Sequence, residues 1–297
     1  MEIIKPGTNI NFVGKIKYAI AISVIVIAIG IGAMILKGGL NYGIDFAGGT
    51  LVELQFKNEP SIDKVRDSLK KIELGESIIQ QFGDTKDILI RVEKSSESLE
   101  GIGEKIKKVI EGDFKNESIE IKRVEMVGPQ VGKELQWQAM MAVLYSMIGI
   151  AIYVAWRFQF KWGIAAIIAL AHDVLITIGI LAITGKEFTL PVLAAVLTVV
   201  GYSINDTIVI FDRIRENMRL KSKESFESII NISINETLSR TFLTVLTVLI
   251  VLLALFIYGG EIIHDFAFTM LVGVSTGTFS SVYIAAPILI FWKAKKK

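Results

Sequence analysis

Residues 17–36 read KYAIAISVIVIAIGIGAMIL, an uninterrupted apolar run. The run has the length of about 20 residues that a helix needs to cross the hydrocarbon core of a bilayer. The whole chain of 297 residues is 52% hydrophobic and only 21% charged. Such a composition excludes a plain soluble enzyme and a disordered chain. The absence of cysteine excludes a disulfide-stapled module and thiolate chemistry.

Five further apolar runs follow, joined by short loops. They cover residues 137–156, 162–184, 189–211, 239–258 and roughly 266–292. The sequence therefore predicts a polytopic α-helical membrane protein with six transmembrane helices and one domain outside the membrane. Residues 1–36 would form an N-terminus and helix 1, and 37–136 the outer domain. Residues 137–292 would form helices 2–6, and 293–297 a basic tail. The first run is too long for the core of a cleaved signal peptide, so we expect an uncleaved anchor.

The basic residues predict the orientation of the chain. Lys and Arg concentrate in the N-terminus, in the loop between runs 2 and 3, between runs 4 and 5, and in the tail. The loops on the opposite side, 185–188 and 259–264, offer only Lys186. By the positive-inside rule both termini are cytoplasmic and the domain faces outside.

In residues 37–136, the pattern of apolar and polar residues predicts an α+β domain. Strands are expected at 50–56, 77–82, 88–93 and 118–127, and amphipathic helices at 61–74 and 99–110. Ser61 is a plausible cap of the first helix, and Gly83 with Asp84 indicates a hairpin turn. The order strand–helix–strand–strand–helix–strand predicts a ferredoxin-like domain. That class hosts many functions, so it predicts no particular activity.

The string GIDFAGGT, residues 43–50, follows the first apolar run. Its paired glycines allow a tight turn or a close approach of two backbone segments. No strand–loop–helix context or following Lys supports a phosphate loop. We therefore expect a structural turn that joins the membrane helix to the domain.

Three ionisable residues stand inside the apolar runs. Asp173 follows His172 near the middle of the third run, Asp206 lies in the fourth run, and Arg240 opens the fifth. Because consecutive helices are antiparallel, Asp206 and Arg240 are expected at similar depth. An ionisable side chain in hydrocarbon costs at least about 2.5–3.5 kcal/mol, so it normally faces a partner or a cavity and often carries protons or ions.

For Asp206 with Arg240 we favour ion transport over a structural ion pair that locks two helices. A guanidinium that moves toward or away from a carboxylate would switch the proton affinity of the carboxylate. For Asp173 both interpretations stay open, because His172 is either its partner or a packing residue. The sequence does not choose between H⁺ and Na⁺ as the coupling ion.

Small polar residues recur in the last two runs. They are Thr241, Thr244 and Thr247 in the fifth run, and Gly273, Gly277 and Ser281 in the sixth. Close helix packing is the usual meaning of the second series, with a hydrated path as the alternative. The charged segment 212–235 is expected to form a helix at the membrane surface.

Five strings in order resemble the SecD/SecF family, and in particular its SecF members. They are GIDFAGGT, VGPQVGKEL (127–135), AHDVLITIG (171–179), GYSINDTIVIFDRIREN (201–217) and SRT (239–241). The resemblance covers nearly the whole chain and includes the six-span plan. The family is related to the resistance–nodulation–division transporters.

The resemblance implies a protein translocase subunit in the bacterial cytoplasmic membrane. With SecD as a separate chain, it would use the proton-motive force to promote preprotein export after SecA-driven insertion. Further implied partners are the SecYEG channel, SecA, YajC and YidC in the wider complex, the unfolded preprotein and membrane lipid. The family's functional carboxylate falls on Asp206 and its functional arginine on Arg240, while Asp173 lies in a family motif. The supporting motif residues are Gly43, Asp45, Gly48, Gly49, His172, Gly201, Ser203, Asn205 and Thr241.

Three other functions fit the sequence less well. A half-transporter for a small molecule or lipid would usually have about twice as many spans and larger outer domains. An intramembrane aspartyl protease using Asp173 and Asp206 lacks a GxGD string, and Arg240 would hold Asp206 ionised. A passive scaffold would make the buried charges dispensable. We expect no enzyme activity, cofactor, metal or nucleic-acid partner.

Overall fold

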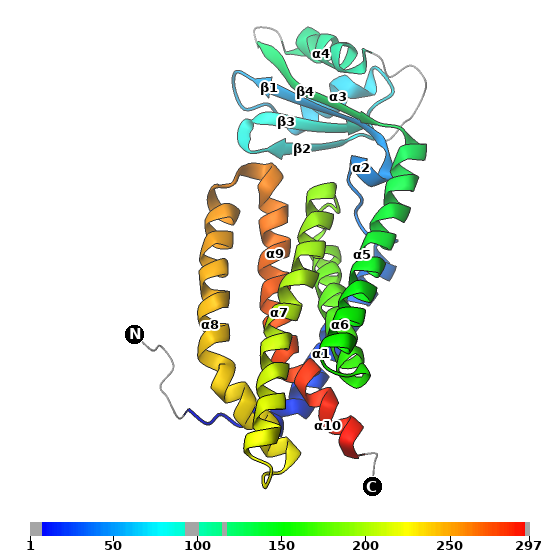
Figure 1. Cartoon of the computed structure of the whole chain (residues 1–297). Helices are drawn as coiled ribbons and strands as arrows, with labels where there is room; N and C mark the ends of the chain where they lie inside the picture. The colour runs from blue at the N-terminus through cyan, green and yellow to red at the C-terminus, as the bar shows by residue number, and fades with distance from the viewer. Residues whose placement is uncertain (1–7, 93–100, 115–117, 295–297) are drawn as a thin grey trace. The chain divides into compact units, whose positions relative to one another are not determined.

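The computed structural model describes residues 8–92, 101–114 and 118–294 (Figure 1). The chain forms two compact units, which we describe separately. The sheet unit comprises Tyr42–Ala139 with Phe188–Leu190, and the helical unit comprises Met1–Asn41, Met140–Glu187 and Pro191–Lys297. The expected basic tail lies largely outside the described residues.

The sheet unit contains a four-stranded antiparallel sheet. Its strands are β1 (Gly49–Phe56), β2 (Ile78–Phe82), β3 (Asp84–Val92) and β4 (Ile119–Val127), in the spatial order β2-β3-β1-β4. Helices α3 (Ile62–Lys70) and α4 (Ile102–Asp113) complete the predicted strand–helix–strand–strand–helix–strand order. Strand β3 lies between β1 and β2 and runs antiparallel to both. The unit is therefore a small α+β domain built on an antiparallel sheet.

Alternation of apolar residues explains why these segments pack as they do. Val52, Leu54 and Phe56 on β1 point to one face of the sheet and join Val65 of α3 and Ile106 of α4 in a continuous core. Successive strand side chains point to opposite faces, so every second residue reaches the helices. The core therefore lies between the sheet and its two helices.

Of two local features predicted for this domain, the hairpin turn is present, whereas the helix cap makes no hydrogen bond. The hairpin between β2 and β3 turns at Gly83, whose φ of +70° glycine adopts without the steric penalty that a Cβ brings. Ser61 occupies the N-cap position of α3, but its side chain makes no capping hydrogen bond. The start of the second predicted helix, Leu99, lies outside the described residues.

Within the described residues, six helical segments are long and apolar enough to cross a membrane. The first five are built on α1 (Ile16–Leu36), α5 (Pro129–Arg157), α6 (Phe160–Thr184), α7 (Leu190–Leu220) and α8 (Phe226–Tyr258). The sixth combines α9 (Gly260–Ser280), the π-helical turn η2 (Ser281–Ala285) and α10 (Ala286–Ala294). All six predicted spans are therefore present, and the chain is a multi-pass membrane protein.

The structure corrects two details of the predicted spans. Segment 212–235 is not a separate surface helix, because α7 continues to Leu220 and α8 begins at Phe226. The sixth span is not one regular helix, since η2 interrupts it. Such π-helical turns are rare and frequently occur at functional sites.

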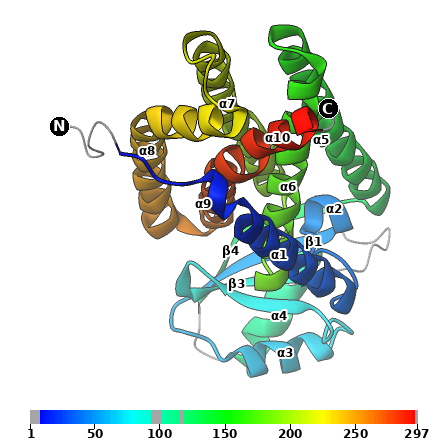
Figure 2. The same ribbon diagram turned by 90° about the horizontal axis from the view of Figure 1, so that it is seen from below.

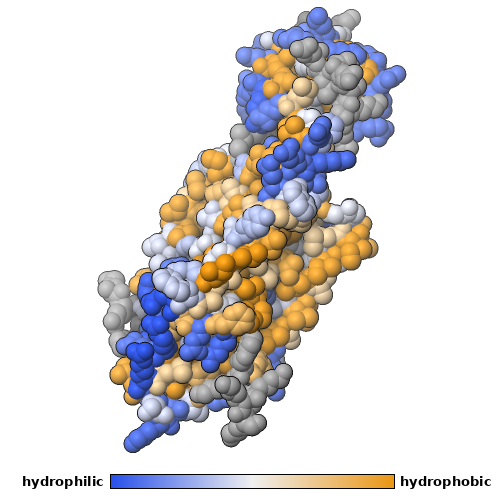
Figure 3. All heavy atoms as spheres, turned by 45° about the vertical axis from the view of Figure 1, so that its right-hand side comes forward, coloured by the Kyte–Doolittle hydropathy of each residue, from blue (hydrophilic) through white to orange (hydrophobic). Residues whose placement is uncertain are grey.

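The helical unit exposes apolar side chains as a membrane protein does. Ile22 of α1, Ile152 of α5 and Ile250 of α8 are all more than half exposed. On the face drawn in Figure 3, apolar residues cover much of the surface of the helices. Helix α6 contacts both α1 and α9, and α9 contacts α8. These contacts bring polar residues from distant parts of the sequence together.

The segment before α1 is bound to α8 (Figure 2). The side chain of Asn235 pairs with both backbone groups of Ile10, at 2.8 and 2.9 Å. Asn231 accepts a hydrogen bond from the backbone N–H of Phe12 at 2.8 Å. Phe12 is buried and its ring meets Tyr283 of η2 edge-on at 5.8 Å. Asn231 and Asn235, one turn apart on α8, thus hold the segment that leads into α1.

Candidate functional site

Asp173 lies at the centre of a hydrogen-bonded cluster in the helical unit and is fully buried. Its Oδ2 accepts hydrogen bonds from Ser203 Oγ of α7 at 2.6 Å and from Ser280 Oγ of α9 at 2.7 Å. Its Oδ1 lies 2.9 Å from His172 Nδ1 on the same helix, α6. Three polar contacts offset the large cost of burying a carboxylate away from water. We call Ser23, His172, Asp173, Ser203 and Ser280 the Asp173 cluster.

His172 extends the cluster to the first span. Its Nε2 lies 2.9 Å from Ser23 Oγ of α1, and the ring stacks on Phe279 at 6.2 Å. An ionised carboxylate can only accept, so with Asp173 ionised His172 Nδ1 must donate. In a neutral imidazole Nε2 then accepts the hydroxyl proton of Ser23. The structure identifies Asp173 as the partner of His172, which the sequence had left open.

A second layer of hydroxyls lies beside this cluster. Thr207 Oγ1 of α7 and Ser281 Oγ of η2 are 2.7 Å apart. Ser281 also donates to the backbone oxygen of Gly277 at 2.9 Å. Both side chains are buried. The π-helical turn thus begins at a residue that joins α7 to the sixth span.

The close approach of α7 and α9 depends on the absence of a side chain at Gly277. A Cβ placed at this residue would come within 2.8 Å of Ser203 Cβ, closer than such atoms normally pack. The small-residue series that the sequence shows in the sixth run therefore packs against α7, as predicted. This packing brings the hydroxyls of Ser203 and Ser280 to the same carboxylate oxygen.

Asp206 differs sharply from Asp173. It is only 3% exposed, yet within the described residues it makes no hydrogen bond or ion pair. Arg240 is exposed and near enough for a Coulombic interaction with Asp206, but it forms no ion pair with it in the described part of the chain. A direct lock between α7 and α8 through these two residues is therefore not seen.

Other polar groups around this region are also without partners. Tyr202 lies one turn from Asp206 on α7 and interacts with it electrostatically. Among the described residues, the buried Tyr202 hydroxyl and Thr241 Oγ1 have no hydrogen-bond partner. Buried polar atoms in native proteins are nearly always hydrogen-bonded, so exceptions need an explanation. Asn205 and Gly201, in contrast, lie on an exposed face of α7.

The GIDFAGGT string forms the predicted turn. It contains the short helix α2 (Ile44–Ala47) followed by Gly48 at φ +76°, where a Cβ would lie 2.9 Å from Pro129 Cα. Gly43 N–H donates to Phe188 O at 3.0 Å, and the Asp45 carboxylate accepts from Leu190 N–H at 2.9 Å. The string therefore holds the residues at the start of α7. It lies in the sheet unit, as does Gly49.

Charged residues at the far end of α7 pair with one another. Glu236 of α8 binds Arg213 at 2.7 Å and Lys221 at 2.9 Å, and Asp212 binds Arg157 of α5 at 3.2 Å. These ion pairs connect the extended ends of neighbouring helices.

The sequence did not single out Ser23, Thr207 or Ser280 as site residues. The hydroxyl of a lone serine in an apolar helix can donate a hydrogen bond to a backbone carbonyl one turn back. The presence of a serine therefore does not by itself indicate a site residue. The only available hint was the concentration of Ser and Thr in the sixth run. Which of these hydroxyls face Asp173 depends on the rotation of each helix.

Six membrane-spanning helices with a hydrogen-bonded carboxylate buried among them define a polytopic α-helical membrane protein. Residues 106–295 match the family model "Protein export membrane protein SecD/SecF, C-terminal", and residues 33–59 match "SecD/SecF GG Motif". The chain belongs to the SecD/SecF family of protein export membrane proteins, on the SecF side of that family.

Its relatives support this assignment. Protein translocase subunit SecF of Desulfurispirillum indicum is 47% identical, over 94% of this chain and 90% of the relative. SecF of Calditerrivibrio nitroreducens is 46% identical, over 100% of this chain and 98% of the relative. The crystal structure of SecDF from Thermus, described as a translocon-associated membrane protein, superposes with a TM-score of 0.87 at 37% identity. The match covers 97% of this chain but only 39% of the SecDF chain, so this chain spans about two fifths of that protein.

Proposed function

We propose that this translocase subunit couples an ion gradient to preprotein export, with Asp206 as the residue that loads and releases the ion. The observation that carries the proposal is the contrast between two buried carboxylates. Asp173 is held by Ser203, Ser280 and His172, whereas Asp206 has no hydrogen-bond partner among the described residues. A carboxylate without fixed donors can take up a proton without breaking an internal network.

Arg240 would control this step through its charge. It lies within electrostatic range of Asp206 without contacting it, so a modest movement of α8 would change the attraction between the two groups. One charge moved across the membrane potential is worth about 2.3 kcal/mol per 100 mV. The Asp173 cluster would supply the fixed frame against which α8 moves.

SecD is the partner that we propose for an exposed face of α7. Ala194, Thr198, Gly201 and Asn205 recur at spacings of four, three and four residues, and all four are exposed. Small and polar residues of this kind allow close packing and hydrogen bonding between membrane helices. The solved SecDF chains contain a match to this chain within a longer protein, which fits a SecD half beside it.

The remaining assignments follow from this proposal. We propose that the chain lies in the bacterial cytoplasmic membrane with both termini cytoplasmic and works beside SecYEG after SecA-driven insertion. YajC and YidC would belong to the wider complex, and the substrate would be the unfolded preprotein. The proton is the ion that we propose. Sodium dependence at constant pH would instead assign Na⁺.

The test is preprotein translocation in vesicles that contain this subunit with its SecD, with and without a proton gradient. Asp206→Asn is expected to abolish the gradient-dependent part of translocation while the complex still assembles. Asp212→Asn is the matched control, because it makes the same change at an exposed, ion-paired carboxylate of the same helix. Full gradient stimulation in Asp206→Asn vesicles would refute the ion-carrier role and favour a passive scaffold.

A further inference from the structure

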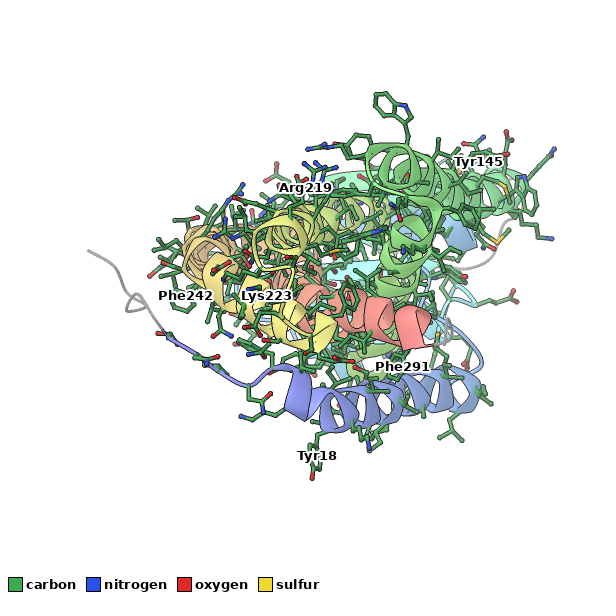
Figure 4. The ribbon with its side chains drawn as sticks, turned by 60° about the horizontal axis from the view of Figure 1, so that its bottom comes forward. Tyr18, Tyr145, Arg219, Lys223, Phe242 and Phe291 are labelled. Atoms are coloured by element: carbon green, nitrogen blue, oxygen red, sulfur yellow. The ribbon has the colours of Figure 1, made fainter. Side chains whose placement is uncertain are left out.

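The first, third and last helices of the helical unit enclose an apolar groove of about 450 Å³. Its walls are formed by α1, α6 and the segment from η2 to α10, including Ile20, Val24, Ile168, Leu175 and Ile288. In Figure 4, Phe291 of α10 lies toward α1, whereas Tyr18 points away from the bundle. We name this feature the α1–α10 groove.

Within the described part of the chain, the groove offers no free polar group to a ligand. The polar residues among those that line it are Ser23 and His172, and their side chains are hydrogen-bonded to each other at 2.9 Å. A polar ligand would therefore lose its hydration without gaining new hydrogen bonds. The chemistry of the walls selects a hydrocarbon.

The size of the groove favours a lipid chain over a helix of another protein. Residues Ile20 and Ile27 mark its extent along α1, which is about 10 Å at 1.5 Å per residue. At 5.4 Å per turn, a helix of another protein would be covered over only about two of its turns. A groove of this length suits part of one extended acyl chain.

Two lysines share the helix faces that line the groove and lie near the N-terminal ends of α1 and α6. Lys17 precedes Ile20 and Val24 by three and seven residues, so it shares their face of α1. Lys161 precedes Ile168 by seven residues and shares its face of α6. Both lysines are exposed, and no acidic residue occurs in the first turn of either helix. An anionic head group would be attracted there by about 1 kcal/mol per lysine.

We propose that the α1–α10 groove binds one acyl chain of an anionic phospholipid, with its head group at Lys17 and Lys161. Lipid tails are as apolar as the walls, so the tail alone gives no preference over the surrounding bilayer. Selectivity comes from the two lysines. The bound chain contacts the edge of the Asp173 cluster through Ser23 and His172.

The experiment uses the purified full chain in phosphatidylcholine vesicles that contain a photoreactive phosphatidylglycerol or a photoreactive phosphatidylcholine. Adducts are located by mass spectrometry. The phosphatidylglycerol probe is expected to label the groove surfaces of α1 and α10 more than the exposed surface of α8. The phosphatidylcholine probe is expected to label these two regions equally.

Two sets of variants, each with its own control, make the test specific. Lys17→Gln and Lys161→Gln should each reduce the preference for the anionic probe about fivefold, whereas Lys223→Gln, in the turn between α7 and α8, should leave it unchanged. Ala171→Phe fills the groove and should reduce its labelling to the level of α8, whereas Ala254→Phe on the exposed side of α8 should not. The lysine variants keep the test valid if Ala171→Phe fails to fold.

Two outcomes would overturn the proposal. Equal labelling by both probes, unaffected by the lysine substitutions, would show ordinary contact with the bilayer. Loss of groove labelling on addition of SecD would assign the groove to a protein interface.

Discussion

Ser280 donates its hydroxyl proton to Asp173 across 2.7 Å, although the two residues are 107 positions apart in the sequence. This bond joins the last span to the third at a point where both side chains are fully buried. Ser203 reaches the same carboxylate oxygen from α7. One carboxyl group therefore connects α6, α7 and α9.

Ser280→Ala should lower the stability of the helical unit. The substitution removes one of the donors to a buried carboxylate, and hydrogen bonds between membrane helices contribute about 0.5–2 kcal/mol. Thermal unfolding in mild detergent would measure the change. Ser275→Ala is the control, because the Ser275 hydroxyl is exposed and bonds only to its own helix at Leu271 O. Equal melting of the two variants would contradict a role for Ser280 beyond its own helix.

The two buried aspartates should respond oppositely to replacement by leucine. Asp173→Leu leaves Ser203, Ser280 and His172 without their shared acceptor and should cost about 3–5 kcal/mol. Asp206→Leu removes a buried carboxylate that has no hydrogen bond among the described residues, so stability should be unchanged or higher. Unfolding temperatures of both purified variants would test this contrast. A comparable loss in both would mean that Asp206 has a structural partner.

Patterns that repeat along the chain were enough to predict the architecture. Alternation of the type seen at Val52 and Leu54 identified β1, and unbroken apolar runs identified the six spans. Each pattern reflects a local requirement, either one apolar face of a strand or a hydrocarbon environment, and can therefore be recognised without tertiary contacts. The GIDFAGGT turn was predicted for the same reason, since the φ of Gly48 is a local property. The burial of both faces of β1 could not be recognised in this way, because Leu51 is covered by Ile44 and Leu89 from other segments.

The contacts between side chains of neighbouring helices could not be predicted from such local patterns. Antiparallel order placed Asp206 and Arg240 at similar depth, but depth does not fix the rotation of α7 and α8 about their axes. Rotation decides that Asp173 meets Ser203 and that Asp206 meets no donor among the described residues. The end of α7 was also missed, because its ion pairs come from Glu236 on another helix.

Gly277→Val should weaken the contact between α7 and α9. Its side chain would begin at a Cβ only 2.8 Å from Ser203 Cβ, so one helix must shift. Overpacking of this kind costs about 1–3 kcal/mol. Unfolding in detergent gives the change, with Gly149→Val of α5 as the control, because no atom lies within 4 Å of a Cβ placed there. Equal effects of the two substitutions would show that the close approach is not required.

Asp113→Asn should remove a small acid-sensitive contribution from the sheet unit. Lys71 donates a hydrogen bond to Asp113, and this bond, with a second from Ser68, holds the pKa of the carboxyl below its ordinary value of 3.8. Because the pKa of Asp113 is lower in the folded chain than in the unfolded chain, the ionised carboxyl stabilises the fold at pH values above the unfolded-state pKa. This contribution is lost as the pH falls through the folded-state pKa. The effect is small because both side chains are substantially exposed.

Hydrogen exchange of the β1 amides, corrected for intrinsic rates, would measure this contribution in the full chain. At neutral pH the Asn variant should exchange slightly faster than the wild-type chain, and well below pH 3.8 the two should converge. Glu120→Gln, at an exposed carboxylate of β4, is expected to match the wild-type chain at both pH values. A difference between Asp113→Asn and the wild-type chain that persists or grows in acid would contradict the sign, because protonation of Asp113 abolishes the ionised partner of Lys71.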